Sequence, residues 1–172
     1  MKSSTSYILV KGGSKTVFVP GNCDPAELLD MEVDGALNLH GKRTAWRNHD
    51  LIGIGGSNPT PFQSLIAFSE KEIQRILSGL KASSNSFILS QVPPYGTRLD
   101  RVFLGRHVGS RALTKFIGEY NPLTAVVGHV HEGRGEQMLG STVIVNPGPG
   151  ARGFYGLMEL GSDGVEVTLS QI

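Results

Sequence analysis

The alternation of short apolar runs with longer amphipathic stretches is the feature that most restricts how this chain can fold. Seven runs have the length and the β-branched or aromatic content of strands. They are Thr16–Val19, Leu51–Ile54, Phe87–Ser90, Thr124–Val127, Thr142–Val145, Phe154–Leu160 and Val165–Leu169. Strands separated by helix-length segments are typical of an α/β domain with one or two mixed sheets. The last three runs have no helix-length gap between them, so we predict an antiparallel meander there.

Three segments begin with residues that start helices. These starts are Asp24 before Pro25, Ser69 with Glu72 in a capping box, and Ser110 before an amphipathic run to Tyr120. The sequence contains no internal repeat, low-complexity tract or linker. We therefore expect residues 1–172 to form a single domain.

The charge balance, the cysteine content and the length of the N-terminal apolar run argue against several classes of protein. Sixteen Lys and Arg residues against fifteen Asp and Glu give a net charge of +1, which disfavours nucleic acid as a partner. The single Cys23 excludes an intramolecular disulfide. The apolar run Tyr7–Val10 is too short for a signal sequence or a membrane span. We therefore expect a cytoplasmic protein with no membrane association.

Glycine is over-represented, at 23 of 172 residues against a background of about 7%. Many of these glycines fall in turns that directly follow the predicted strands. Five such turns carry polar side chains: Gly21–Asp24, Gly55–Asn58, Gln91–Pro94, Gly128–His131 and Asn146–Gly148. In open α/β sheets, ligands bind beyond the carboxyl ends of the strands. We therefore predict that the five turns converge on one crevice.

The pair His129 and His131 is the sharpest local signal. Residues two apart in an extended segment point to the same side, so both imidazoles would face one pocket. Neutral imidazole is the commonest metal ligand in proteins. The alternative is that both histidines only cap a strand and bond to backbone carbonyls. The other histidines, His40, His49 and His107, are interpreted as loop or surface residues.

The turns around Asn22 and Gln91 offer weaker donors. The segment Gly21–Asp24 follows a strand and opens a predicted helix, so its free N–H groups suit an anion such as phosphate. The Asn22 carbonyl oxygen can bind a hard cation, and Cys23 can act as a weak proton donor or ligand. Gln91 is a neutral donor and a poorer ligand than histidine.

Several motifs together resemble the calcineurin-like metallophosphoesterase family. They are Val19–Asp24, Ser90–Thr97, Gly128–Glu132 and Asn146–Gly148, in the family's order, with further counterparts at Asn38–Lys42, Gly53–Phe62 and His107–Ala112. The likeness is greatest to small prokaryotic, especially archaeal, phosphodiesterase-like members. It extends over nearly the whole chain from Thr16 onward.

The resemblance implies a sandwich of two mixed sheets flanked by helices, and the hydrolysis of phosphoesters. Two divalent ions, commonly manganese, iron, zinc or nickel, would clamp the phosphate and activate a water molecule. Position by position, Asn22, Gln91 and His129 would serve the second ion and His131 the first. Asn22 would also contact the phosphate. Cys23 stands where many members have a histidine that assists the leaving group.

The sequence also departs from the family pattern. The family opens with one strand that ends in D-x-H and another that ends in G-D, and neither motif occurs here. We interpret Met1–Lys15 as the tail of the next helix, so the fold would lack the first two strands. At position 91 the family normally has histidine. The resemblance therefore implies at most one bound ion and a chain that is inactive as it stands.

Three hypotheses follow. In the first, the chain is a metallophosphoesterase whose opening segment is missing from the sequence. In the second, it is a non-catalytic protein-binding module, and an exposed sheet edge pairs with a protein partner or a second copy. In the third, Asn22, Gln91 and His129, with or without His131, hold a single ion.

Overall fold

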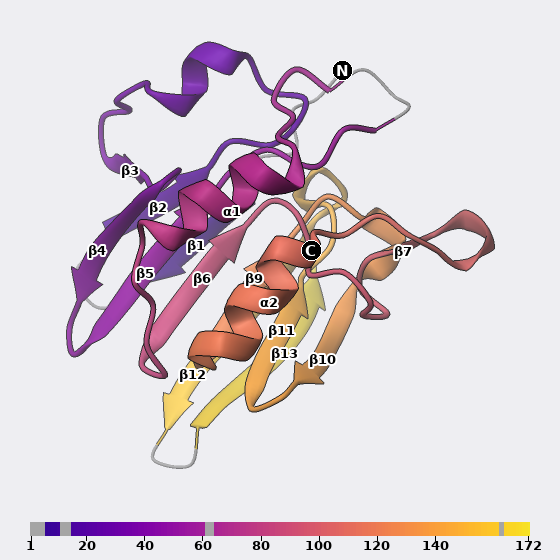
Figure 1. Cartoon of the computed structure of the whole chain (residues 1–172). Helices are drawn as coiled ribbons and strands as arrows, with labels where there is room; N and C mark the ends of the chain where they lie inside the picture. The colour runs from indigo at the N-terminus through magenta and orange to yellow at the C-terminus, as the bar shows by residue number, and fades with distance from the viewer. Residues whose placement is uncertain (1–5, 11–14, 61–63, 162–163) are drawn as a thin grey trace.

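A six-stranded mixed sheet forms the centre of the part of the molecule that the structure describes (Figure 1). The computed structural model describes residues 6–10, 15–60, 64–161 and 164–172. In spatial order the strands are β10 (Gly135–Leu139), β11 (Thr142–Asn146), β9 (Thr124–Val127), β6 (Ser86–Ser90), β5 (His49–Ile54) and β4 (Lys42–Trp46). The inner strands run parallel to one another, and the outermost strands β10 and β4 run antiparallel to their neighbours. The carboxyl ends of all inner strands therefore lie along the same edge of the sheet, which we call the carboxyl edge.

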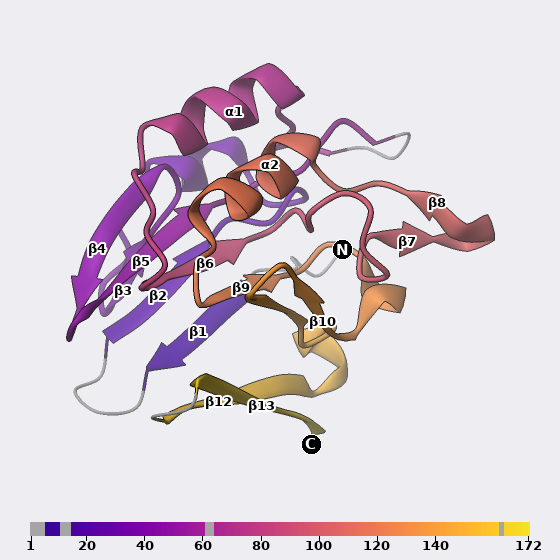
Figure 2. The same ribbon diagram turned by 60° about the horizontal axis from the view of Figure 1, so that its bottom comes forward.

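A second layer of strands covers one face of this sheet (Figure 2). It contains a mixed three-stranded sheet of β1 (Ser6–Val10), β2 (Lys15–Val19) and β3 (Ala36–Asn38). Beside it lies an antiparallel hairpin of β12 (Phe154–Gly161) and β13 (Gly164–Gln171). The predicted α/β sandwich with two mixed sheets is confirmed.

The helices α1 (Glu70–Ser78) and α2 (Arg111–Tyr120) cover the opposite face of the central sheet (Figures 1 and 2). Both predicted starts are confirmed: Ser69 and Glu72 form a reciprocal capping box, and the Ser110 side chain accepts from the Leu113 N–H. The remaining elements are short: η1 (Ala26–Leu29), β7 (Arg101–Val102), η2 (Phe103–Gly105), β8 (Arg106–His107), η3 (His131–Gly133) and η4 (Gly150–Arg152). No helix in the described ranges is long and apolar enough to cross a membrane.

The period-two alternation of strand side chains divides the core into two clusters. On β5, Ile52 and Ile54 pack with the helices, while Leu51 packs with the second strand layer. On β6, Ile88 belongs to the first cluster, and its neighbour Phe87 belongs to the second. The central sheet is therefore buried on both faces. This explains why its inner strands read as continuous apolar runs.

Two predictions about strands are wrong. Residues 6–10 form β1, which pairs antiparallel with β2, and not the tail of a helix, because Tyr7–Val10 is a β-branched and aromatic run. The predicted meander fails at β11, which pairs with β9 and β10 and not with β12. Ile144 and Val145 of β11 are buried, so this strand needs cover on both faces. Residues 1–5, 11–14 and Phe62 lie outside the described part.

The predicted helix after Asp24 is only the four-residue 3₁₀ helix η1, and its N-cap is Pro25. The Asp24 carboxylate instead accepts from the Gly21 N–H at 2.7 Å and closes the turn on itself. The turn therefore lacks the α-helical N-terminus that the predicted anion site required.

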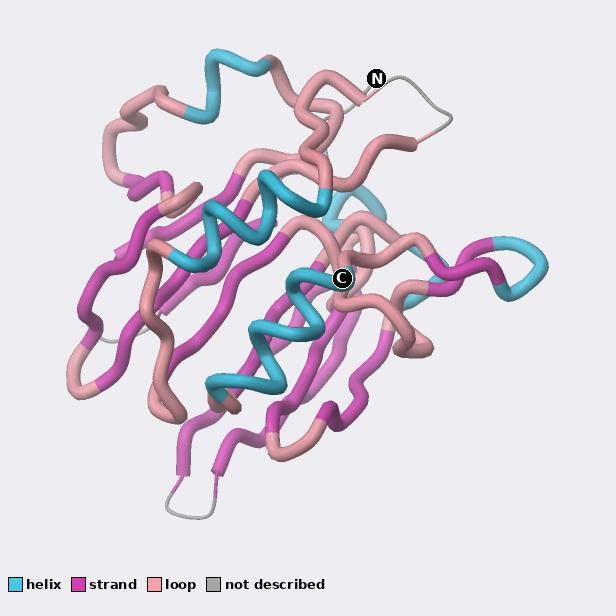
Figure 3. The backbone as a smooth tube through the Cα atoms, in the orientation of Figure 1, coloured by secondary structure: helices cyan, strands magenta, loops and turns pink. Residues whose placement is uncertain are grey.

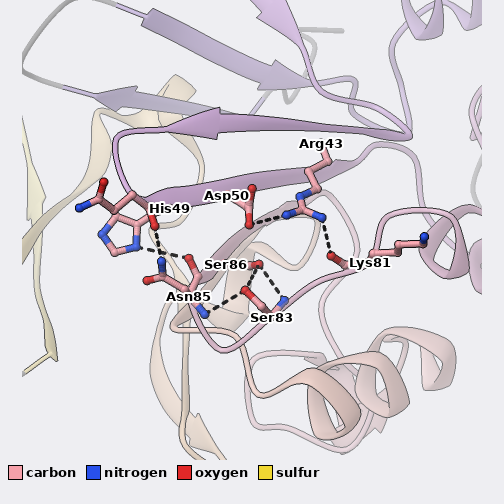
Figure 4. A network of polar contacts seen from close by, with 8 residues as sticks. Arg43, His49, Asp50, Lys81, Ser83, Asn85 and Ser86 are labelled. Carbon is pink, nitrogen blue, oxygen red and sulfur yellow. Dashed lines mark hydrogen bonds and ion pairs between the residues drawn. The ribbon is translucent and has the colours of Figure 1, made fainter.

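A polar network joins the amino ends of β5 and β6 (Figure 4). The Arg43 guanidinium contacts the Asp50 carboxylate at 2.8 Å and donates to the Lys81 carbonyl at 3.0 Å. The Ser83 and Ser86 hydroxyls lie 3.3 Å apart in the turn before β6. An exposed ion pair of this kind is worth about 1 kcal/mol or less. The network anchors the edge of the sheet that lies away from the polar turns.

Candidate metal centre

The five polar turns lie together at the carboxyl ends of the parallel strands. Figure 3 shows the strands of the central sheet giving way to loops at this edge. Four hydrogen bonds join the turns in sequence: Gly56 N–H to the Pro20 carbonyl, Gln91 N–H to Ile54, Gly128 N–H to Gln91, and the Asn146 side chain to Val130. The turns therefore adjoin one another as predicted, and the crevice between them stays a prediction.

Asn22, Gln91 and His129 meet at the middle of this edge. The Asn22 Oδ1 accepts from the Gln91 Nε2 at 3.3 Å and lies 3.1 Å from the His129 Nδ1. Asn22 is 7% exposed and Gln91 is fully buried. The three residues come from turns up to 107 positions apart in the sequence. Three of the four predicted ligands are therefore in direct contact.

The other side of the Asn22 amide is fixed by Ser64, a residue that the sequence did not single out. The Asn22 Nδ2 donates to the Ser64 Oγ at 3.1 Å, and Ser64 lies 3.0 Å from the Thr60 hydroxyl. The main-chain carbonyl of Asn22 also accepts from the Leu65 and Ile66 N–H groups. These contacts hold Oδ1 toward Gln91 and His129. No local motif marks Ser64, since the contact spans 42 residues.

His129 occupies an unusual backbone conformation. Its φ is +66°, and the Val130 N–H donates to the Gly128 carbonyl at 2.8 Å, which closes a tight three-residue turn around His129. Such turns are rare and strained, and strain of this kind concentrates at functional sites. Asn146 secures the turn by donating to the Val130 carbonyl at 2.8 Å. The extended geometry predicted for the two histidines is therefore wrong.

His131 is nevertheless close enough to His129 to affect its pKa. It is exposed and begins η3. Burial lowers the pKa of His129, and the charge of His131 lowers it further. His129 is therefore held in the neutral form, which is the form that binds metals.

The order of these turns in the sequence is that of a known family. The sequence pattern of the family described as "metallophosphoesterase, calcineurin superfamily" matches residues 9–170. This chain belongs to the calcineurin superfamily of metallophosphoesterases. Members of this superfamily use divalent metal ions.

Individual metallophosphoesterase-like relatives are longer than this chain. An uncharacterized protein of Methanocaldococcus jannaschii is 39% identical over 136 residues, which are 76% of this chain and 62% of that protein. The chain therefore spans less than two thirds of this curated relative. One crystal structure, 27% identical, matches with a TM-score of 0.69 over 90% of this chain and 65% of its own. A Thermus thermophilus crystal structure, 21% identical, has the same fold, with a TM-score of 0.59 over 88% and 71%.

The side chains of this cluster offer donors that would suit a single ion. Two ligands of one octahedral ion lie about 3 Å apart, which is close to the 3.1 Å between Asn22 Oδ1 and His129 Nδ1. A half-turn of the Gln91 amide would bring its oxygen to the position of Nε2 and complete a set of three donors. Within residues 6–10, 15–60, 64–161 and 164–172, no three His, Cys, Asp or Glu side chains gather as an ion site. Two ions would need carboxylates that this cluster lacks.

Cys23 is the fifth predicted site residue, and it lies beside the cluster. Its thiol is half-buried and accepts from the Asn22 Nδ2 at 3.5 Å. A thiol is a weak hydrogen-bonding group, so this contact adds little to the orientation of Asn22. The catalytic role of Cys23 stays a prediction.

The remaining histidines are not ordinary surface residues. The His40 Nδ1 accepts from the Gly55 N–H at 3.0 Å, its ring stacks on Phe68, and burial lowers its pKa. The His49 ring packs edge-on against Phe87, with centroids 5.3 Å apart. His107 lies 2.6 Å from a buried carboxylate. The sequence missed these environments because each partner lies in another element of the fold.

Proposed function

We propose that this chain hydrolyses phosphoesters with the help of one divalent ion held by Asn22, Gln91 and His129. The observation that carries the proposal is that Gln91 and His129 both contact the Asn22 Oδ1 at the carboxyl edge of a metallophosphoesterase fold. An ion held at this position would polarise a phosphoryl oxygen and would lower the pKa of a water molecule bound to it. We propose manganese, iron, zinc or nickel as the ion.

Each proposed site residue has a separate task. Asn22 and His129 offer an oxygen and a nitrogen to the ion, and Asn22 also contacts the phosphate. Gln91 supplies a third, weaker donor. His131, exposed beside His129, is available to a second ion if further ligands are present. Cys23 lies where a proton donor to the leaving group is expected.

The dinuclear centre implied by the resemblance is proposed only for a protein with more ligands than the described residues supply. Two amides and two imidazoles bind divalent ions less strongly than a set that includes carboxylates. The matched relatives are longer than this chain. Activity at a dinuclear centre in a protein of that length is therefore also a proposal. For the chain itself we propose slow, metal-dependent turnover in place of the inactivity that the departures from the family pattern imply.

The test compares His129→Gln with His49→Gln, because both variants remove one imidazole and His49 lies at the opposite edge of the sheet. Binding of Zn²⁺ and Mn²⁺ is measured by calorimetry, and hydrolysis is measured with bis(4-nitrophenyl) phosphate. We expect binding and hydrolysis to fall in His129→Gln and to persist in His49→Gln. Binding that is equal in both variants and the wild type would contradict the assignment.

A second candidate function is a protein-binding module without catalysis. It is favoured by the exposed apolar side chains Leu37 on β3, Met138 on β10, and Tyr155 and Leu157 on β12. The first two lie on strands at the edges of their sheets, where a protein partner or a second copy of the chain can pair. Light scattering across a concentration series tests self-association. A monomer that also captures no partner would count against this candidate.

A further inference from the structure

A second polar cluster, around Asp100 and His107, lies next to the short helix η3 that follows His129 in the chain, and the proposed function does not use it. The hairpin β7–β8 projects on the side toward which β6 points (Figures 1 and 2). Its strand β7 packs against η3, the short helix that begins at His131. The approach is at backbone distance, because a Cβ placed on Gly133 would lie 2.1 Å from the Leu99 carbonyl oxygen. Asp100 directly follows Leu99, so the chain enters the Asp100 cluster at this contact with η3.

Asp100 is a fully buried carboxylate with a complete set of partners. Its Oδ2 accepts from the Gly109 N–H at 3.0 Å and the Gly96 N–H at 3.2 Å, and its Oδ1 lies 2.6 Å from the His107 Nδ1. A Cβ on Gly109 would lie 2.8 Å from Oδ2, so the loop can close on the carboxylate only with glycine there. The backbone therefore fixes where Asp100 points.

His107 is fixed in turn by Asp100 and Tyr95. Its side chain is 24% exposed, and its ring lies 5.3 Å from the Tyr95 ring, centroid to centroid. The Arg111 guanidinium lies over the Tyr95 ring at 3.7 Å. A carboxylate on Nδ1 sets the tautomer and leaves Nε2 to act on something else. Imidazole held in this way is well suited to general acid or base catalysis.

We propose that His107, in place of the weakly donating Cys23 thiol, donates a proton to the leaving oxygen of the phosphoester and that Asp100 positions its ring. The proposal rests on the proposed function. The bond between phosphorus and the leaving oxygen breaks, its electron pair stays on that oxygen, and the oxygen takes the Nε2 proton of His107, which reacts as the doubly protonated imidazolium paired with the Asp100 carboxylate. Water forms the new bond to phosphorus and releases a proton to the solvent. His107 then recovers its proton from the solvent.

This assignment narrows the substrate class. Proton donation matters most when the leaving group is a strong base, so the natural substrates are phosphoesters of aliphatic alcohols. The charged side chains around the pair suit an anionic substrate, since Arg101 and Arg106 flank His107 on the hairpin and Arg111 lies behind Tyr95. All three arginines are exposed.

The test compares two esters in the wild type and three variants. One ester is 4-nitrophenyl phosphate, whose leaving group needs no proton, and the other is a glycerol phosphate, whose leaving group does. We expect His107→Gln to lose about 100-fold or more on the glycerol ester and little on the nitrophenyl ester. Asp100→Asn should show the same pattern to a smaller extent. The matched control His49→Gln should hydrolyse both esters like the wild type.

Equal losses on both esters in His107→Gln would overturn the proposal, because a merely structural role cannot distinguish leaving groups. If the wild type hydrolyses neither ester in the presence of metal, the proposed function itself fails. The His107 assignment is then decided by ¹⁵N NMR of its ring during titration with inorganic phosphate. A shift of the Nε2 resonance would support His107 as a phosphate contact, and no shift would overturn it.

Discussion

At the scale of single residues, Asn22 is the centre of the candidate site. The two polar atoms of its side-chain amide make different contacts. Oδ1 faces Gln91 and His129, and Nδ2 donates to Ser64. The residue is almost fully buried, so these contacts replace the water that an amide would otherwise bind. The orientation of one side chain therefore decides whether the two donors beside it can share an ion.

Gln91→His should strengthen metal binding, because imidazole is a better ligand than an amide for zinc and manganese. Changes near a metal typically alter its affinity about 10 to 100-fold, and we expect an increase in this range. Calorimetric titration with Zn²⁺ measures the change. Gln74→His, on the exposed side of α1, is the matched control and should bind like the wild type. An unchanged affinity in Gln91→His would show that residue 91 is not a ligand.

His40 should make the protein less stable in mild acid. Burial lowers the pKa of His40 in the folded state, whereas the unfolded chain titrates near 6.5. Above that pH both states are neutral, and as the pH falls below it the unfolded state takes up protons first. The free energy of unfolding should therefore fall between pH 7 and pH 5. Urea unfolding should show a smaller fall in His40→Gln, and an equal fall would refute the explanation.

At the scale of elements, the two helices are joined by one carboxylate. Glu70 is the first residue of α1, and its side chain accepts from the N-terminus of α2, from the Ala112 N–H at 2.8 Å and the Ser110 hydroxyl at 3.0 Å. It also accepts from the Asn58 side chain at 2.5 Å. A negative charge at a helix N-terminus is favourable. The start of α1 therefore caps α2.

Glu70→Gln should lower the free energy of unfolding by about 1 to 2 kcal/mol, because hydrogen bonds to a charged group contribute more than neutral ones. The change is measured by urea unfolding at neutral pH. Glu136→Gln removes a carboxylate from an exposed position on β10 and should have little effect. A Glu70→Gln protein as stable as the wild type would mean that the cap contributes nothing.

Two glycine substitutions should shift stability in opposite directions. A Cβ on Gly53 of β5 would lie 2.3 Å from the Leu39 Cβ, so Gly53→Ala should destabilise by about 1 to 3 kcal/mol. A Cβ on Gly118 of α2 meets nothing within 4 Å, so Gly118→Ala should stabilise by up to about 1 kcal/mol. Thermal unfolding of both variants tests the pair. The same sign in both would contradict the packing described here.

At the scale of the whole molecule, the inner strands of the central sheet could be predicted and its edge strands could not. The seven predicted strands all form. The inner strands are marked by continuous apolar runs because they are buried, whereas the exposed hairpin of β12 and β13 is marked by its β-branched and aromatic residues. The edge strands β4 and β10 were missed, since residues such as Lys42 and Glu136 interrupt the apolar pattern of strands that are partly exposed.

The same distinction holds for the site. Asn22, Gln91 and His129 were found because each follows a recognisable strand. The sequence could not have revealed Ser64 as the partner of Asn22, nor Asp100 as the partner of His107. Both pairs depend on where separate turns lie in the folded chain. The left-handed backbone of His129 was missed for another reason, since a positive φ is uncommon in any residue other than glycine, although histidine adopts it more often than most.

The most direct test of the account is a crystal of the protein soaked in Zn²⁺ and measured at the zinc absorption edge. The account predicts an anomalous peak about 2.0 to 2.2 Å from both the Asn22 Oδ1 and the His129 Nδ1. A peak there would show that the cluster at the carboxyl edge of the sheet is a metal centre. Strong peaks elsewhere and none at this cluster would contradict the central claim.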